Sequence, residues 1–305
     1  MSKVSIIGAG AVGSLVAFNL TSKNLSDVIL VDIIKGKAQG KALDISQSLP
    51  IFNSNSKIIG TSEYSETKNS DIVIITAGFP RKSSMTRDDL CEVNSKILTS
   101  IIPNIIKESP DCILLIVTNP LTAMTQLAYN LSGFSKQKVL GMAGVLDSSR
   151  FKFFLSEKIE IKNSEIKTFV LGDHGDLMVP LISSCKIDDK NLDDFLSKND
   201  IDFVISKVRN AGGEIISLLK NESTSFAPAA CIFEMVESIL KNKSKILPCT
   251  VLLEGEYGID NLFVGVPVKL GKNGVEEIVI FDLSNEEKIQ LNNSVNHIKK
   301  LIKKI

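Results

Sequence analysis

Short apolar runs alternate with helical patterns along the first 140 residues of the chain. Unbroken apolar runs suit parallel strands that are covered on both faces of a sheet. The expected strands cover residues 4–7, 28–31, 72–76, 113–117 and 139–140, and the expected helices cover residues 11–22, 36–48, 88–108 and 120–131. Strand–helix alternation of this kind predicts an α/β fold with a doubly wound parallel sheet.

The second half of the chain is less regular. Helical patterns are expected at residues 146–159, 202–220, 226–241 and 285–304, and β-rich runs at residues 166–171, 246–253, 261–270 and 275–281. This mixture predicts a C-terminal mixed α/β domain. Gly141 and Gly144 mark the change of pattern, so we expect an N-terminal domain of residues 1–143 and a C-terminal substrate domain of residues 144–305.

Composition narrows the class of protein. Of the 305 residues, 44% are hydrophobic and 23% are charged, which is typical of a soluble globular protein and excludes a disordered or fibrous chain. The formal net charge is zero, which disfavours nucleic acid and anionic membranes as partners. The five cysteines are far apart and form no CxxC pair, so we expect a protein of the reducing cytoplasm that contains no disulfides. Glycines interrupt the apolar run that ends at Leu20, which favours a strand–turn–helix over a secretion signal.

A glycine motif follows the first expected strand and opens the first expected helix. In it, Gly8 serves the tight turn, Gly10 lets the backbone approach a pyrophosphate, and Gly13 allows close helix–strand packing. The helix N-terminus favours phosphate. Asp32 closes the next strand, where a carboxylate accepts the ribose hydroxyls and repels a 2′-phosphate. These features predict a Rossmann-type NAD site; the alternative is a glycine-rich turn with an unrelated strand-end acid.

Two histidines are present. His297 lies in a lysine-rich terminal segment and is expected to be a solvated surface residue. His174 lies in a glycine-flanked loop after a β-rich run, where active-site groups gather, and histidine exchanges protons near neutral pH. If the protein uses a histidine base, that base is His174; otherwise it is an ordinary loop residue. Two distant histidines and scattered cysteines predict no metal site.

Arginine is rare in this chain. Of its 35 basic residues, four are arginines, namely Arg81, Arg87, Arg150 and Arg209, so an arginine suggests a need for a planar, bidentate donor. Arg81 and Arg87 share a polar loop, and Arg150 follows Asp147 by three residues, on one face of an expected helix. Two interpretations remain open: a pocket for a small dianionic substrate, or a local Asp147–Arg150 salt bridge with the other arginines scattered.

Five motifs occur in order between residues 8 and 176: Gly8-Ala9-Gly10-Ala11-Val12-Gly13, Thr76-Ala77-Gly78-Phe79-Pro80-Arg81-Lys82, Thr118-Asn119-Pro120, Leu146-Asp147-Ser148-Ser149-Arg150-Phe151 and Gly172-Asp173-His174-Gly175-Asp176. Together they make the chain resemble the malate dehydrogenases of the lactate-dehydrogenase-like type. The resemblance implies reversible oxidation of (S)-malate to oxaloacetate with NAD, as in the tricarboxylic acid cycle. It also implies a homotetramer, or a dimer, that buries helices such as 36–48 and 226–241.

The resemblance assigns catalytic roles. His174 would be the general base toward the malate hydroxyl, and Asp147 would hold the imidazole tautomer and stabilise the imidazolium. Arg150 would clamp the C1 carboxylate, and Arg87, on a mobile lid, would polarise the reacting carbonyl. Arg81 would pair with the second carboxylate.

Further contacts follow from the resemblance. Asn119 would orient the substrate and the nicotinamide, and Thr224 would line the pocket. The cofactor-binding residues implied are Gly8, Gly10, Ala11, Val12, Gly13, Asp32, Thr76, Ala77, Gly78, Asn94, Val117 and Asn119.

Position 81 bears on the choice of substrate. In the lactate branch of the family, the position that matches residue 81 is typically a neutral glutamine. Arg81 would instead leave a buried charge unpaired against the methyl group of pyruvate. Ser83-Ser84 departs from the Pro-Gly pair of the family lid, which removes a glycine's freedom at the hinge. The alternatives are a lactate or broader 2-hydroxy-acid dehydrogenase, and an NAD-binding sensor without activity.

Overall fold

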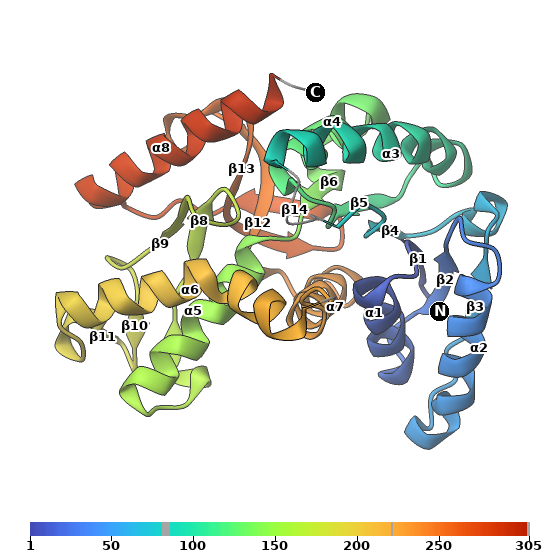
Figure 1. Ribbon diagram of the computed structural model, residues 1–305, viewed down its shortest axis with the longest axis horizontal. Helices are drawn as coiled ribbons and strands as arrows, with labels where there is room; N and C mark the ends of the chain where they lie inside the picture. Colours follow the sequence, from blue (N-terminus) through green and yellow to red (C-terminus); the bar gives the residue numbers. More distant parts are fainter. Residues whose placement is uncertain (81–85, 221, 304–305) are drawn as a thin grey trace.

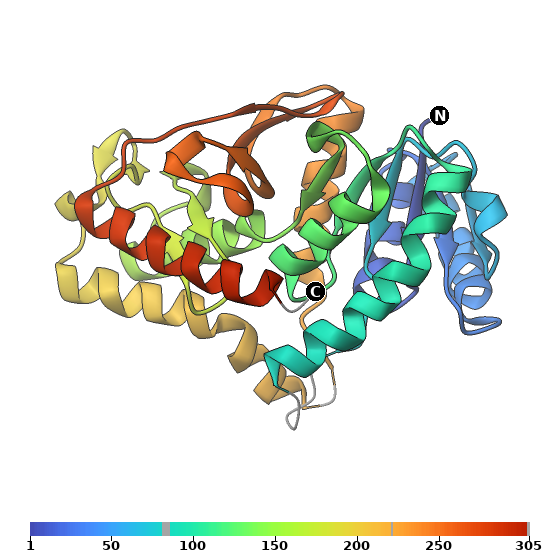
Figure 2. The ribbon, with the colours of Figure 1, turned by 90° about the horizontal axis from the view of Figure 1, so that it is seen from above.

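The computed structural model describes residues 1–80, 86–220 and 222–303 and shows an α/β fold in three layers (Figure 1). The sheet forms the middle layer, with α3, α4 and α8 on one face and α1, α2, α5, α6 and α7 on the other. Viewed from above, the N-terminal and C-terminal halves of the chain lie side by side (Figure 2). None of the described helices is long and apolar enough to cross a membrane.

The N-terminal half contains six parallel strands in the order β3-β2-β1-β4-β5-β6. They are β1 (Lys3–Ile7), β2 (Asp27–Val31), β3 (Ile58–Thr61), β4 (Ile72–Ile75), β5 (Ile113–Ile116) and β6 (Val139–Gly141), with helices α1 (Ala11–Ser22), α2 (Lys37–Ser48), α3 (Arg87–Glu108) and α4 (Leu121–Ser132). This is the order of a doubly wound dinucleotide-binding sheet, whose topological switch lies between β1 and β4. The fold class expected from the sequence is confirmed.

Apolar strand residues are buried on both faces of this sheet, which explains their unbroken runs. In β4, Ile72 and Ile74 join the core beneath α1 and α7, while Val73 and Ile75 join the core beneath α3 and α4. All four side chains are 0% exposed.

The C-terminal half extends the same sheet with antiparallel strands, because Thr250 of β12 pairs with Gly141 of β6. The remaining strands of this half are β7 (Ile166–Lys167), β8 (Val170–Gly172), β9 (Met178–Pro180), β10 (Lys186–Ile187), β11 (Lys190–Asn191), β12 (Lys245–Glu254), β13 (Asp260–Gly271) and β14 (Gly274–Ile278), and its helices are α5 (Gly144–Ile159), α6 (Lys198–Leu219), α7 (Phe226–Leu240) and α8 (Asn285–Ile302). The pairing changes between β6 and α5, where the sequence places the domain boundary. The boundary itself stays a prediction, because one sheet joins both halves.

Several elements differ from the expectations. The edge strand β3 and the short strands β9, β10 and β11 were not predicted, and the run 166–171 is split into β7 and β8. The helix expected from residue 202 begins at Lys198, because the Ser197 side chain accepts a hydrogen bond from the backbone N–H of Asp200 and caps it.

Candidate active site

The glycine loop between β1 and α1 is tightly packed beneath and open above. Gly8 has φ +112°, and a Cβ there would lie 2.8 Å from the backbone nitrogen of Ala77. A Cβ on Gly13 would lie 2.0 Å from the carbonyl oxygen of Gly8, whereas a Cβ on Gly10 would meet nothing within 4 Å. The loop therefore leaves its open side, at the N-terminus of α1, for a ligand.

Asp32 lies at the end of β2 with its carboxylate 8% exposed. It accepts hydrogen bonds from the backbone N–H groups of Ala9 at 2.9 Å and Ile34 at 3.0 Å, and Lys37 Nζ lies 3.0 Å from its Oδ2. Burial raises the pKa of Asp32, but the bonds from Ile34, Lys37 and Ala9 outweigh it, and the net pKa is lowered. Asp32 is thus ionised at neutral pH, as a ribose acceptor needs to be. Sequence reasoning missed Lys37, since lysine is common in this chain.

The ends of β1, β4 and β5 are tied together at the same edge of the sheet. Thr76 Oγ1 donates to the carbonyl oxygen of Gly8 at 3.0 Å, and Thr118 Oγ1 donates to that of Ala77 at 2.7 Å. A Cβ on Gly78 would lie 2.6 Å from the Thr118 methyl carbon, so this segment packs without slack.

Asn94 of α3 is 1% exposed and braces this edge. Its Oδ1 accepts the backbone N–H of Phe79 at 2.7 Å, and its Nδ2 donates to the carbonyl oxygen of Asn119 at 2.6 Å. The backbone N–H of Val117 donates to Ile75 at 3.0 Å. The Asn94 amide thus connects two loops of the site, and a direct contact between Asn94 and the cofactor stays a prediction.

The structure brings His174 and Asp147 together, although 27 residues separate them. Nδ1 of His174 lies 2.9 Å from Oδ2 of Asp147, whose side chain is 2% exposed in the first turn of α5. Because an ionised carboxylate only accepts, this contact places the proton on Nδ1 and leaves Nε2 available. The Asp147 charge raises the pKa of His174; burial and the charge of Arg150 lower it, and the net pKa is raised.

Arg150 completes this cluster one helical turn after Asp147. Its NH1 lies 3.8 Å from Asp147 Oδ1, which is too long for a hydrogen bond, and the guanidinium is 12% exposed. In the described part of the chain, the buried Asp147 Oδ1 has no hydrogen-bond partner. A Cβ on Gly212 of α6 would lie 3.6 Å from Arg150 NH2, so α6 packs closely beside the guanidinium. Arg150 thus lies beside the Asp147 carboxylate, and no hydrogen bond to another described residue occupies its donors, which can therefore bind an anion.

The other predicted residues are placed less completely. Arg81 lies outside the described residues, and the structure describes only the backbone of Arg87, at the first position of α3. Thr224 is half-buried just before α7. The substrate contacts of these residues stay predictions. Among the described residues, no group of three or more His, Cys, Asp and Glu side chains is arranged to hold a metal ion.

His297 corrects an expectation. Its side chain is 26% exposed, and its Nε2 lies 3.8 Å from Oδ2 of Asp173, the residue before His174. The histidine is therefore not the solvated surface residue that the lysine-rich segment indicated. No sequence signal could have paired these residues, because 124 positions separate them in the chain.

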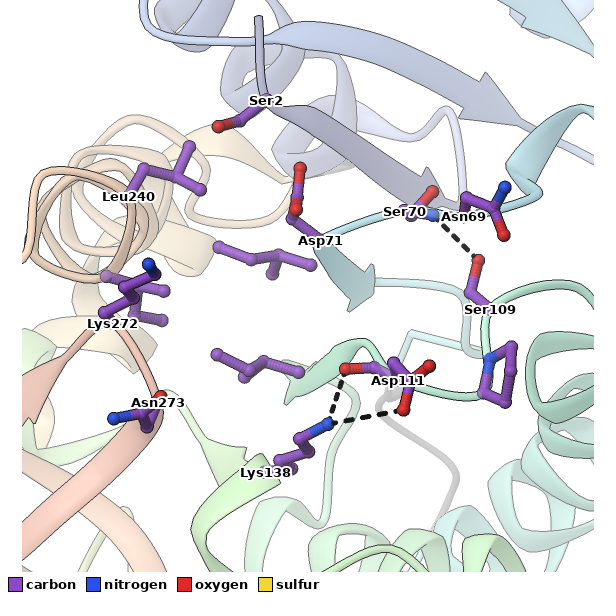
Figure 3. A pocket seen from close by; sticks show the side chains of 14 residues that line it. Ser2, Asn69, Ser70, Asp71, Ser109, Asp111, Lys138, Leu240, Lys272 and Asn273 are labelled. Carbon is purple, nitrogen blue, oxygen red and sulfur yellow. Dashed lines mark hydrogen bonds and ion pairs between the residues drawn. The ribbon is translucent and has the colours of Figure 1, made fainter.

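A cavity of about 430 Å³ lies at the amino ends of β1, β4 and β5, the edge opposite the glycine loop (Figure 3). Its polar groups bond to one another: Lys138 Nζ donates to the carbonyl oxygen of Asp111 at 2.7 Å, and Ser109 Oγ accepts the backbone N–H of Ser70 at 3.0 Å. It contains none of the predicted site residues.

A doubly wound sheet with an open glycine loop and a strand-end acid, followed by a His–Asp pair beside an arginine, is typical of nicotinamide-dependent dehydrogenases. Residues 2–141 match the family described as lactate/malate dehydrogenase, NAD binding domain, and residues 144–305 match the alpha/beta C-terminal domain of the same family. The chain belongs to the lactate/malate dehydrogenase family. The match confirms the NAD prediction and the resemblance seen in the five motifs.

The relatives include both branches of this family. The malate dehydrogenase of Bacillus subtilis (strain 168) is 45% identical over 303 residues, covering 99% of this chain and 97% of that protein. The crystal structure of Cryptosporidium parvum malate dehydrogenase is 45% identical with a TM-score of 0.96, covering 99% of this chain and 98% of that chain. The lactate dehydrogenase of Cryptosporidium parvum, complexed with lactic acid and the nicotinamide dinucleotide, is 38% identical with a TM-score of 0.97, covering 99% and 97%. Fold similarity alone therefore does not separate the two substrates.

Proposed function

We propose that this chain is an NAD-dependent malate dehydrogenase that interconverts (S)-malate and oxaloacetate by hydride transfer. The observation that carries the proposal is the cluster of His174, Asp147 and Arg150, a proton acceptor and an anion-binding group held together at 2.9 and 3.8 Å. The identity of 45% to malate dehydrogenases over nearly the whole chain supports malate as the substrate.

The glycine loop fits the cofactor. Among the described residues, Gly10 has no neighbour within 4 Å of a Cβ position and no side chain caps α1, so the first N–H groups of α1 are available to a pyrophosphate. Ala11, Val12 and Gly13 would supply those groups, and Asp32 would bind the adenosine ribose. Thr76, Ala77, Gly78, Asn94, Val117 and Asn119 would form the adjoining wall. When bound, NAD accepts the hydride that leaves C2 of malate.

The proton follows a separate route. Nε2 of His174 takes the proton from the malate hydroxyl as the hydride leaves, which forms oxaloacetate and an imidazolium. Asp147 stabilises that imidazolium from the Nδ1 side at 2.9 Å. In the reverse direction the imidazolium donates its proton to the carbonyl oxygen of oxaloacetate.

The arginines select the dicarboxylate. Arg150 binds the C1 carboxylate through its guanidinium N–H groups, Arg87 polarises the reacting carbonyl, and Arg81 pairs with the second carboxylate. Pyruvate would place a methyl group against Arg81, and an unpaired buried charge costs several kcal/mol. Thr224 and Asn119 complete the pocket.

The test compares NADH oxidation with oxaloacetate and with pyruvate, in the unaltered protein and in Arg81→Gln. We expect oxaloacetate to be preferred by orders of magnitude, and the variant to shift the preference toward pyruvate. If the unaltered protein prefers pyruvate, the proposed substrate is wrong and the protein is a lactate dehydrogenase, as in the second branch of the family. Binding of NADH without turnover of either acid would indicate a sensor.

We further propose a cytoplasmic homotetramer, with no nucleic-acid or membrane partner. Apolar side chains stand exposed on the helices expected to be buried by assembly, with Leu43 of α2 62% exposed and Phe226 of α7 78% exposed. Static light scattering at micromolar concentration measures the mass; a tetramer is expected, and a monomer would contradict the proposal.

A further inference from the structure

The loop that carries His174 is anchored by the preceding residue, Asp173, whose side chain is 9% exposed. Thr122 Oγ1 donates to Asp173 Oδ1 at 2.7 Å, and this bond is buried. The backbone N–H of Asp173 donates to Ser294 Oγ, also at 2.7 Å and buried. Nε2 of His297 lies 3.8 Å from the second carboxylate oxygen. Asp173 is thus held from two sides.

The two sides come from distant elements of the fold. Thr122 lies in the first turn of α4, three residues after Asn119, whereas Ser294 and His297 lie three residues apart on one face of α8. Figure 2 shows α8 (red) running along the C-terminal half toward α4 (green). Asp173 therefore connects the imidazole loop to the end of β5, where Asn119 lies, and to the C-terminal helix.

The backbone before Asp173 is closely packed and leaves no space for a side chain at Gly172. Gly172 has φ +83°, and a Cβ there would lie 2.6 Å from Ser294 Oγ. On the other side, a Cβ on Gly265 of β13 would lie 2.5 Å from the carbonyl oxygen of Gly172. A displacement of Asp173 would move His174 as well, because His174 follows it directly in the chain.

The charged and titratable groups around His174 come from its own loop and from α5, α6 and α8. Asp147 and Arg150 face it from α5, Asp173 flanks it on its own loop, and His297 of α8 faces Asp173. Arg209 of α6 donates to the Met178 carbonyl, later in the same segment. Among these groups Asp147 raises the pKa of His174 most, burial and Arg150 lower it, and Asp173 raises it further. Two carboxylates thus favour the imidazolium.

We propose that Asp173 is a positioning residue for His174: through Thr122 and α8 it holds the loop that carries the imidazole, and its carboxylate is a second negative charge that stabilises the imidazolium. An amide at position 173 would accept the Thr122 hydrogen bond equally well, so a role in anchoring alone does not require the charge. The inference rests on the proposed function, because it concerns the proton step assigned to His174.

The first test reads the imidazole directly and needs no substrate. The chain has two histidines, so protein labelled with 13C at histidine gives two ring signals, and His297→Gln identifies that of His174. The signal is titrated in the unaltered protein, in Asp173→Asn and in Asp193→Asn, an exposed control that removes the same charge elsewhere. We expect the His174 midpoint to move to lower pH in Asp173→Asn and to stay in place in Asp193→Asn. Equal midpoints in all three proteins would overturn the proposal.

Kinetics test the consequence for catalysis. Reduction of oxaloacetate needs protonated His174, so its decline with rising pH should move to lower pH in Asp173→Asn, while the KM for oxaloacetate stays within about two-fold. Thr122→Val keeps the charge but removes the buried hydrogen bond, and kcat should fall about three- to ten-fold. Thr122→Ser should restore kcat.

Each failure has a distinct meaning. If Asp173→Asn does not fold, Thr122→Val decides the anchoring role, and an unchanged kcat in that variant would refute it. If the unaltered protein reduces no oxaloacetate while the His174 midpoint still shifts in Asp173→Asn, the proposed function fails and the role of Asp173 toward His174 stands.

Discussion

Removing the charge of Asp147 provides the strongest test of the proposed proton step. Asp147→Asn keeps the size of the side chain but replaces a carboxylate, which only accepts, by an amide that both accepts and donates, so the charge opposite His174 Nδ1 is lost. The loss is that of the charged hydrogen bond, which spans 2.9 Å and lies in a site where Asp147 is 2% exposed. A hydrogen bond to a charged group contributes about 1.5–3 kcal/mol. Since each 1.36 kcal/mol corresponds to a factor of ten, kcat should fall roughly 10- to 150-fold.

Asp147→Asn should also shift the pH dependence of activity in a definite direction. The charge of Asp147 raises the pKa of His174 in the folded protein, so its removal lowers that pKa. The decline of oxaloacetate reduction with rising pH should therefore move to lower pH, and so should the rise of malate oxidation. The assay is steady-state NADH absorbance in both directions from pH 5 to 10, with Asp193→Asn as the charge control. A variant that binds NADH normally, loses less than two-fold in kcat and keeps its pH profile would refute the reasoning.

Three further predictions concern the cofactor site and the core. Gly13→Ala places a Cβ 2.0 Å from the Gly8 carbonyl oxygen, so thermal unfolding should show a loss of about 1–3 kcal/mol; Gly10→Ala, whose Cβ meets nothing within 4 Å, should keep that stability yet weaken NADH binding measured by fluorescence. Lys37→Met removes the cation 3.0 Å from Asp32, which leaves the carboxylate to repel the 2′-phosphate of NADPH more strongly. Binding of NADPH should therefore fall relative to that of NADH, whereas Lys35→Met, at an exposed position, should change the binding of neither. Burial raises the pKa of Cys112 to about 12 and of Cys185 to about 11, so a thiol reagent should label both only after unfolding; rapid labelling of the native protein would contradict their burial.

The fold of the N-terminal half could be predicted because its strands carry their own signal. Strands such as β4 are buried on both faces and read as unbroken apolar runs, and the glycine motif identifies the first turn. The edge strand β3 escaped prediction because its residues are mostly half-buried or exposed, so the run is not distinct from a loop. Strands of two or three residues, such as β10, are determined by tertiary pairing rather than by local pattern.

The candidate site could be predicted where the residue types that act in it are rare in the chain. Histidine and arginine are scarce, so His174 and Arg150 stand out, and the spacing of Asp147 and Arg150 indicates one helix face. The contact between His174 and Asp147 could not be derived from spacing, because it depends on how α5 and the loop after β8 pack. Lys37 illustrates the opposite limit, since a common residue gains a role only through its position beside Asp32.

Continuity of the sheet explains why residues from both halves meet at one site. β6 pairs with β12 at Gly141 and Thr250, and a Cβ on Gly141 would lie 2.6 Å from Thr125 Oγ1 of α4, so the junction is closely packed. Because α5 begins three residues after β6 ends, Asp147 enters the site directly from this junction. His174 arrives at the end of β8, which joins the same sheet through β13. The sheet thus positions α5 and the loop after β8, which carry the carboxylate and the proton acceptor, and substitutions that loosen the β6–β12 pairing should lower kcat before they unfold the protein.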